Sequence, residues 1–237
     1  MIFFSAPSGS FASTASSVTE EKIEDLTYKA VVFTLYDLKK IEDVEKISYQ
    51  ITGENKILFK IIVEMVINML ECDKKRTPFT HISCENKYKT DYTTANGNKI
   101  LLKGFIDKID ENEKSVHLID YKTTKLNDNI DATKVLNTDE LTNFFYAPND
   151  KKYVKEILQM CFYNILYKEK TNKEIETYLF LARMSFDHDN FLANTQVVLP
   201  DDWEAIFKAE LDKVVDNLMN KEEKICQTSN TKNCEYC

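Results

Sequence analysis

The sequence predicts a mixed α/β domain, an α+β or α/β sandwich in which helices pack on one central sheet. Two observations lead to this expectation. Apolar residues follow helical spacing in the N-terminal third and change to strand spacing near residue 81. Beyond the run of strands, helix, strand and helix follow one another to the end of the chain. That order of elements is typical of a sheet covered by helices.

The expected helices are read from apolar residues that recur every three to four positions. One or two amphipathic helices are expected within residues 20–48, and a helix with a broad apolar face over about residues 56–72. Further helices are expected over residues 151–168 and roughly 202–221.

The expected strands lie between these helices. Residues 81–92, 99–110 and 115–123 alternate as strands do, with turns at Asn96-Gly97 and at residues 111–114. Shorter strands are expected over residues 176–184 and 195–199. The polar stretch 124–150 has no sustained apolar period, which predicts a long loop that could close over a site.

The composition bounds the class of protein. At 237 residues the chain can bury a core, it has no apolar run long enough to span a membrane, and its N-terminus lacks the basic start of a signal peptide. A cytoplasmic protein is therefore expected. The net charge of -8 at pH 7 is unusual for a free-standing DNA-binding protein. Cations bound by clustered carboxylates, or neighbouring domains that contact phosphates, would offset it.

One group of acids points to chemistry. If residues 104–122 form a hairpin that turns at Glu113-Lys114, Asp107 and Asp120 lie opposite each other, with side chains roughly 5 Å apart. Lys122 projects from the same face as Asp120, because side chains alternate along a strand. Glu85 arrives from the preceding strand. Three acids and a lysine are thus expected at one edge of the sheet.

These residue types suit hydrolysis of a phosphodiester. Carboxylates hold Mg²⁺ or Mn²⁺, which acidifies a bound water and offsets charge on the phosphorus. The Lys122 ammonium can orient that water or act on it as a base. The competing interpretation is that acids are common near turns, and Asp110, Glu111 and Glu113 are read as turn residues. Asp107 and Asp120 differ because they border apolar strand positions, where an acid is costly unless paired or bound to metal.

The segment 104–110, Gly-Phe-Ile-Asp-Lys-Ile-Asp, followed by Leu-Ile-Asp-Tyr-Lys-Thr at 118–123, resembles the PD-(D/E)XK nuclease domain of the RecB and AddB type. Gln159 and Tyr163 match the later Gln-x-x-x-Tyr motif of that family. Residues 53–78, which lead to Glu85, look like the AddB-type nucleases of Bacteroidetes-like bacteria. The resemblance covers roughly residues 53–237 and implies a restriction-endonuclease-like core.

The resemblance also implies roles for individual residues. Lys122 would be the catalytic lysine, and Gln159 and Tyr163 would hold the DNA strand or the catalytic groups. The implied ligands of Mg²⁺ or Mn²⁺ are Asp107, Asp120, the backbone carbonyl of Tyr121, and Glu85, either directly or through water. Many relatives carry a metal-binding histidine on an early helix, and none of the three histidines of this chain occupies a comparable position: His81, His117 and His188.

The six cysteines divide into two groups. Cys72, Cys84 and Cys161 are expected to be free thiols. The other three resemble the C-terminal cysteines that hold a [4Fe–4S] cluster in AddB-type and CRISPR-associated nucleases: Cys226, Cys234 and Cys237. Three cysteines at these spacings complete neither such a cluster nor a zinc site, so a cluster is expected only in a longer protein.

These observations divide the chain into three parts. Residues 1–52 are expected to be a helical, partly disordered segment, residues 53–225 the nuclease core, and residues 226–237 a truncated cysteine-containing tail.

The expected function is that of a metal-dependent DNA exonuclease, part of a helicase–nuclease that processes DNA ends in recombination and DNA repair. No Walker A pattern occurs, so a helicase motor would belong to another domain or subunit. The alternative is a catalytically silent module that keeps the nuclease fold as a DNA-binding scaffold. A restriction-type endonuclease would need a dimer and a base-reading element, and the sequence indicates neither.

Overall fold

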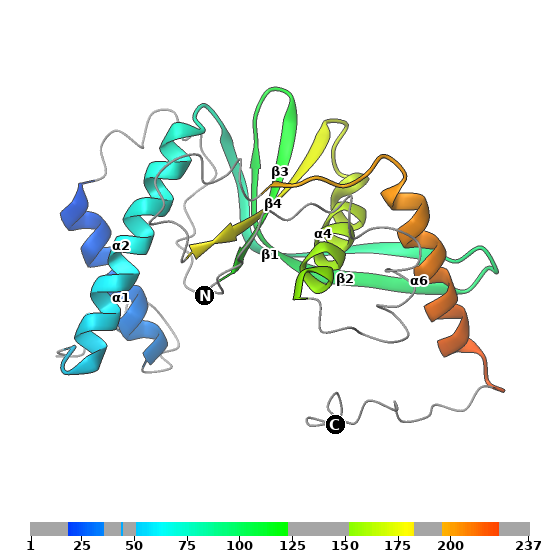
Figure 1. The fold of residues 1–237 in the computed structure, drawn as a ribbon, viewed down its shortest axis with the longest axis horizontal. Helices are drawn as coiled ribbons and strands as arrows, with labels where there is room; N and C mark the ends of the chain where they lie inside the picture. Colours follow the sequence, from blue (N-terminus) through cyan, green and yellow to red (C-terminus); the bar gives the residue numbers. More distant parts are fainter. Residues whose placement is uncertain (1–18, 36–43, 45–50, 123–151, 183–195, 223–237) are drawn as a thin grey trace.

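A five-stranded mixed sheet forms the centre of the computed structural model, which describes residues 19–35, 44, 51–122, 152–182 and 196–222 (Figure 1). The elements follow one another in this order: α1 (Glu20–Leu35), α2 (Glu54–Lys75), β1 (Thr80–Thr93), β2 (Lys99–Glu111), β3 (Ser115–Lys122), α4 (Lys152–Lys168), β4 (Glu174–Leu181), β5 (Gln196–Val197) and α6 (Trp203–Met219).

The strands lie in the sheet in their order along the chain. β1, β2 and β3 form an antiparallel meander, β4 runs parallel to β3, and β5 runs antiparallel to β4. A parallel neighbour requires a crossover, and α4 lies in the segment that makes it. The sheet flanked by helices confirms the predicted α/β, restriction-endonuclease-like fold.

Tight turns fix the register of the first three strands. Gly97 adopts a φ of +86°, which suits glycine, in the turn between β1 and β2. Between β2 and β3, the Asn112 side chain accepts hydrogen bonds from the backbone amides of Lys114 and Ser115 at 2.8 Å. Both predicted turns are therefore confirmed.

The first two strands are longer than the third. β3 pairs only with residues 108–111 of β2, whereas β1 and β2 pair along almost their whole length. Residues 86–93 and 99–106 therefore project from the sheet as a two-stranded ribbon, called here the hairpin arm (Figure 1).

The main core lies between the sheet and the helices α4 and α6. It contains fully buried side chains from strands and helices alike, including Ile109, Leu118, Ile157, Leu179 and Phe207. Phe162 of α4 meets Phe207 edge to face, with ring centroids 4.9 Å apart. The near-continuous apolar run of β3 is explained by its central place, since residues 115–121 are all buried.

The helices α1 and α2 pack on each other at the other side of the molecule (Figure 1). Tyr28 and Phe59 form an edge-to-face pair with ring centroids 6.0 Å apart. None of the described helices is long and apolar enough to cross a membrane.

The predicted helices and strands agree closely with the described elements. Three expectations lie outside the described residues: the loop over residues 124–150, most of the helical segment after Leu35, and the cysteine tail.

Candidate active site

The end of β3 brings Asp120 and Lys122 together on the side of the sheet that α4 covers. Lys122 Nζ lies 2.7 Å from Asp120 Oδ2. Asp120 is almost completely buried, at 1% exposure, while Lys122 remains partly accessible. The pair therefore consists of a buried carboxylate and a partly exposed ammonium.

Two side chains of the helix α4 contact Asp120 and Lys122. Gln159 Nε2 donates to Asp120 Oδ1 at 2.8 Å, and Gln159 Oε1 accepts from Lys122 Nζ at 2.9 Å. Tyr163, one turn further along, donates its hydroxyl to Asp120 Oδ1 at 3.1 Å. Gln159 Nε2 also lies 2.8 Å from the Tyr163 hydroxyl. The side chains that the Gln-x-x-x-Tyr motif singled out therefore contact Asp120 and Lys122 directly.

Asp107 reaches the same place from β2. The pairs Asp110 with His117 and Lys108 with Ile119 confirm the hairpin register predicted from the turn at Glu113-Lys114. One step further, this register sets Asp107 opposite Asp120. Asp107 Oδ2 accepts a hydrogen bond from the Tyr121 backbone amide at 3.0 Å, so it is tied to the strand that carries Asp120.

Glu85 lies on β1 beside Asp107. The pairs on either side of it, Cys84 with Lys108 and Asn86 with Ile106, place it opposite Asp107. Its backbone adopts a φ of +50°, rare for a residue with a side chain. Glu85 as a residue is exposed to solvent. The loss of some of its hydration and the negative charge of Asp107 together raise the pKa of Glu85.

The negative charge of Asp107 acts on the other two acids, Asp120 and Glu85. Burial raises the pKa of Asp120 to about 6, against the Lys122 ammonium, and the charge of Asp107 adds to the increase. Asp107 thus disfavours negative charge on both of its neighbours, Asp120 and Glu85. A bound cation would relieve this repulsion.

One oxygen of Asp120 suits a metal ion. Oδ2 is buried and accepts no well-aligned hydrogen bond from the described residues, although the Lys122 ammonium lies at ion-pair distance. Among the described residues, no group of three or more His, Cys, Asp or Glu is placed to hold a metal ion. The two facing carboxylates of Asp107 and Asp120 suit a hard cation that keeps several of its waters, as Mg²⁺ does.

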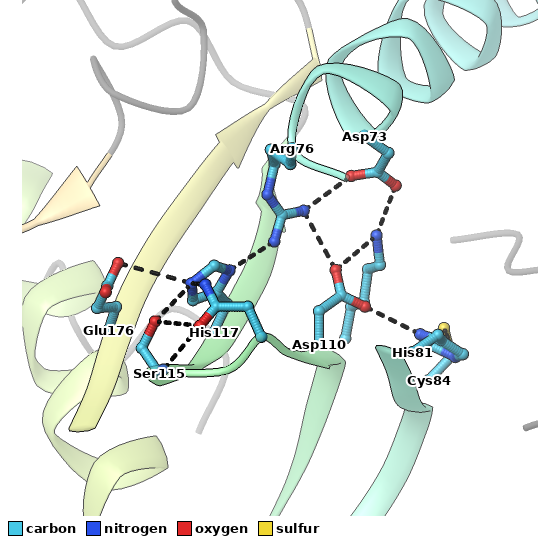
Figure 2. A network of polar contacts seen from close by, with 10 residues as sticks. Asp73, Arg76, His81, Cys84, Asp110, Ser115, His117 and Glu176 are labelled. Carbon is cyan, nitrogen blue, oxygen red and sulfur yellow. Dashed lines mark hydrogen bonds and ion pairs between the residues drawn. The ribbon is translucent and has the colours of Figure 1, made fainter. Parts of the chain in front are cut away.

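The sequence interpretation of Asp110 and Glu111 as turn residues was wrong, because both belong to β2. Asp110 is fully buried at the centre of a polar network between α2 and the sheet (Figure 2). Asp110 accepts hydrogen bonds from Arg76 at 3.1 Å and His81 at 3.1 Å, and Lys108 Nζ lies 3.0 Å away. Asp73 contacts Arg76 at 2.9 Å and Lys108 at 2.6 Å.

Three cations, Arg76, Lys108 and His81, surround the two carboxylates of this network. The hydrogen bond to Asp110 raises the pKa of His81 to about 9, so this ring is protonated at neutral pH. Burial by itself would raise the pKa of Asp110, but His81, Lys108 and Arg76 outweigh it and hold that pKa below its ordinary value.

His117 behaves differently from His81. Burial and the Arg76 guanidinium lower the pKa of His117, so its ring is neutral. Arg76 then donates to Nδ1 at 2.7 Å, and Nε2 lies 2.9 Å from the Ser115 hydroxyl (Figure 2). His81 and His117 therefore belong to the polar network between α2 and the sheet and do not lie beside Asp107 and Asp120.

The cysteines of the described residues are free thiols, as predicted, with Cys161 buried and Cys72 and Cys84 partly so. His188 and the three cysteines expected to resemble a cluster site lie outside the described residues: Cys226, Cys234 and Cys237. The iron–sulfur or zinc assignment for them remains a prediction.

Comparison with known proteins addresses the family directly. Residues 15–237 match the family model described as the PD-(D/E)XK nuclease superfamily. No curated protein matches the chain. A crystal structure of a protein designated SSO0001 is similar over 91% of this chain and 81% of that one, at 15% identity and a TM-score of 0.34. Because the family model spans nearly the whole chain, this protein belongs to the PD-(D/E)XK nuclease superfamily.

Proposed function

We propose that this chain is a metal-dependent deoxyribonuclease that hydrolyses phosphodiester bonds at the Asp107, Asp120 and Lys122 site. The observation that carries the proposal is the convergence of β2, β3 and α4 on one carboxylate–ammonium pair. PD-(D/E)XK nucleases generally use divalent metals, and the site offers a buried carboxylate oxygen without an aligned partner.

Each residue has a separate task in this proposal. Asp107 and Asp120 would hold Mg²⁺ or Mn²⁺, with the Tyr121 carbonyl and, directly or through water, Glu85 as further ligands. The cation would supply an acidified water and offset charge on the phosphorus. The Lys122 ammonium holds the attacking water or a phosphate oxygen beside the pair. Gln159 and Tyr163 keep Asp120 and Lys122 in position.

We further propose that the chain acts on DNA ends as an exonuclease of the RecB and AddB type, in a helicase–nuclease of recombination and DNA repair. The order of its motifs supports this, because the segments 104–110 and 118–123 are followed at Gln159 and Tyr163 by side chains that contact Asp120. The motor would belong to another domain or subunit. The proposal includes the division of the chain into an N-terminal segment (1–52), a nuclease core (53–225) and a cysteine-containing tail (226–237).

The test is cleavage of end-labelled linear DNA, single- and double-stranded, with Mg²⁺, with Mn²⁺ and with chelator. We expect cutting only with metal. Asp120→Ala should lower the rate about a thousandfold, since it removes a metal ligand, and Lys122→Ala about a hundredfold.

Two exposed residues supply matched controls, Asp201→Ala and Lys170→Ala, which should cut as the wild type does. Metal-dependent cutting that persists in both site variants would refute the assignment of residues. A folded wild type that cuts no DNA under any condition would favour the catalytically silent scaffold.

A further inference from the structure

The outer face of the hairpin arm is built from alternate residues of β1 and β2. Along β1 it carries Lys87, Lys89, Asp91 and Thr93, and along β2 Lys99, Leu101, Lys103 and Phe105. All of these side chains are exposed, while the residues between them turn toward the helices. The strand register pairs Lys87 with Phe105, Lys89 with Lys103, and Thr93 with Lys99.

The charge of this face is opposite to that of the whole chain. It carries four lysines and one aspartate, although the protein has a net charge of -8. None of the four lysines forms an ion pair with a carboxylate of the described residues. Lys89 and Lys103 face each other across the ladder, an arrangement that destabilises an antiparallel pair. An anion bound across the ribbon would relieve that repulsion.

An aromatic ring lies among these lysines. Phe105 is 55% exposed, and Lys87 Nζ lies 5.9 Å from the centre of its ring. Exposure to water does not stabilise an apolar phenylalanine ring, but the ring offers a flat surface on which a base can stack. Lysines that contact phosphates beside a stacking ring are the combination that proteins use to bind single-stranded nucleic acid.

The arm is held in a fixed place relative to the candidate active site. Its inner face packs on α4, where Tyr88 meets Tyr167 edge to face at 5.4 Å. Its tip is tied to α6, because the Asp216 carboxylate accepts hydrogen bonds from three residues of the tip: Thr94 at 2.8 Å, Asn96 at 2.6 Å and Asn98 at 2.7 Å.

The other end of the arm joins the candidate active site. Glu85 and Asp107 lie immediately beyond Asn86 and Ile106, the last pair of the arm. A strand that lies along the outer face of the arm therefore ends beside Glu85, which is exposed, while Asp120 and Lys122 lie on the side of the sheet that α4 covers.

We propose that the outer face of the hairpin arm binds the single strand of DNA that is cut, through its four lysines and Phe105. This proposal rests on the proposed nuclease function and adds the surface that guides the substrate to the site. The lysines contact successive phosphates, and Phe105 stacks on a base close to the scissile bond.

The experiment measures binding and cutting separately. A labelled single-stranded oligonucleotide and, separately, its duplex are titrated with the protein in chelator, over a range of salt concentrations, by fluorescence anisotropy. The arm variant carries Lys→Gln at residues 87, 89, 99 and 103. The matched control carries Lys→Gln at four exposed lysines outside the arm: Lys22, Lys56, Lys60 and Lys114.

We expect the arm variant to reduce the slope of log affinity against log salt by about 2 to 3, since each phosphate contact on a single strand contributes about 0.7. The control variant should leave the slope unchanged, and Phe105→Ala should weaken binding about tenfold.

Equal salt slopes for the wild type, arm and control variants would overturn the proposal, as would a wild type that binds no single strand. A loss confined to duplex DNA would overturn the assignment to a single strand. Metal-dependent cutting by the wild type is scored independently, so the arm proposal can fail while the nuclease function stands, and the reverse.

Discussion

At the scale of single residues, the two oxygens of Asp120 have different surroundings. Oδ1 receives hydrogen bonds from Gln159 and Tyr163, which fix the orientation of the carboxylate. Oδ2 is buried and lies 2.7 Å from the Lys122 ammonium, which offsets its charge. The carboxylate is therefore held by hydrogen bonds at one oxygen and by an ion pair at the other.

Gln159 gives the first prediction at this scale. Gln159→Ala removes the bridge between Asp120 and Lys122, and residues that orient metal ligands typically affect metal affinity or activity by about 10- to 100-fold. We expect the cleavage rate at saturating DNA to fall about tenfold and the Mg²⁺ concentration for half-maximal rate to rise.

If Gln159 contributed only to folding, Gln159→Ala would leave the Mg²⁺ concentration for half-maximal rate unchanged. Tyr163→Phe should shift the half-maximal Mg²⁺ concentration in the same direction, because it loses only the hydroxyl that contacts Asp120. Lys155→Ala, exposed on the same helix, is the control and should match the wild type. Wild-type metal dependence in both Gln159→Ala and Tyr163→Phe would refute the positioning role.

At the scale of elements, the polar network around Asp110 joins the end of α2 to β1, β2 and β3 (Figure 2). The free energy of its His81–Asp110 contact depends on pH. The pKa of His81 is raised from 6.5 to about 9 in the folded chain, so its contribution to stability is fully present below pH 6.5. That contribution is lost as the pH rises through about 9.

The prediction is a loss of stability between pH 6.5 and pH 9. The free energy of unfolding of the wild type, measured by urea denaturation, should fall by at most about 3 kcal/mol across this range. His81→Gln cannot titrate and should show a much flatter dependence. A wild-type curve that is flat over this range, or one that His81→Gln reproduces, would contradict the account of the network.

The elements also show how far sequence reasoning could reach. Alternation of apolar residues and two turn signals were enough to give the register that sets Asp107 opposite Asp120. Asp110 could not be interpreted in this way, because two of its three cations come from distant positions, Arg76 34 residues earlier and His81 29 residues earlier. Nothing in the residues around an acid tells whether a remote guanidinium will cover it.

The candidate active site also contains contacts that the residue pattern alone could not predict. The contacts of Gln159 and Tyr163 with Asp120 were suggested by resemblance to a family and not by helical spacing, which fits an ordinary core tyrosine equally well. The basic face of the hairpin arm was not anticipated either. Its lysines form two pairs along the sequence, 87 with 89 and 99 with 103, and only the pairing of β1 with β2 gathers all four on one face.

At the scale of the whole molecule, three groups of charged residues lie in order along β1 and β2. The hairpin arm presents lysines, Glu85 and Asp107 lie next to it, and the network around Asp110 follows. The net charge of -8 is therefore unevenly distributed. Acids gather at the candidate metal site, and lysines gather on the arm beside it.

The most direct test of the central claim is the single-turnover cleavage rate of Asp120→Asn with saturating Mg²⁺. This change keeps the size of the side chain and its contact with Tyr163 while it removes the charge that would hold the cation. We predict a rate at least about a hundredfold below that of the wild type, with circular dichroism unchanged. A wild-type rate in Asp120→Asn would contradict the claim that this carboxylate holds the metal ion for phosphodiester hydrolysis.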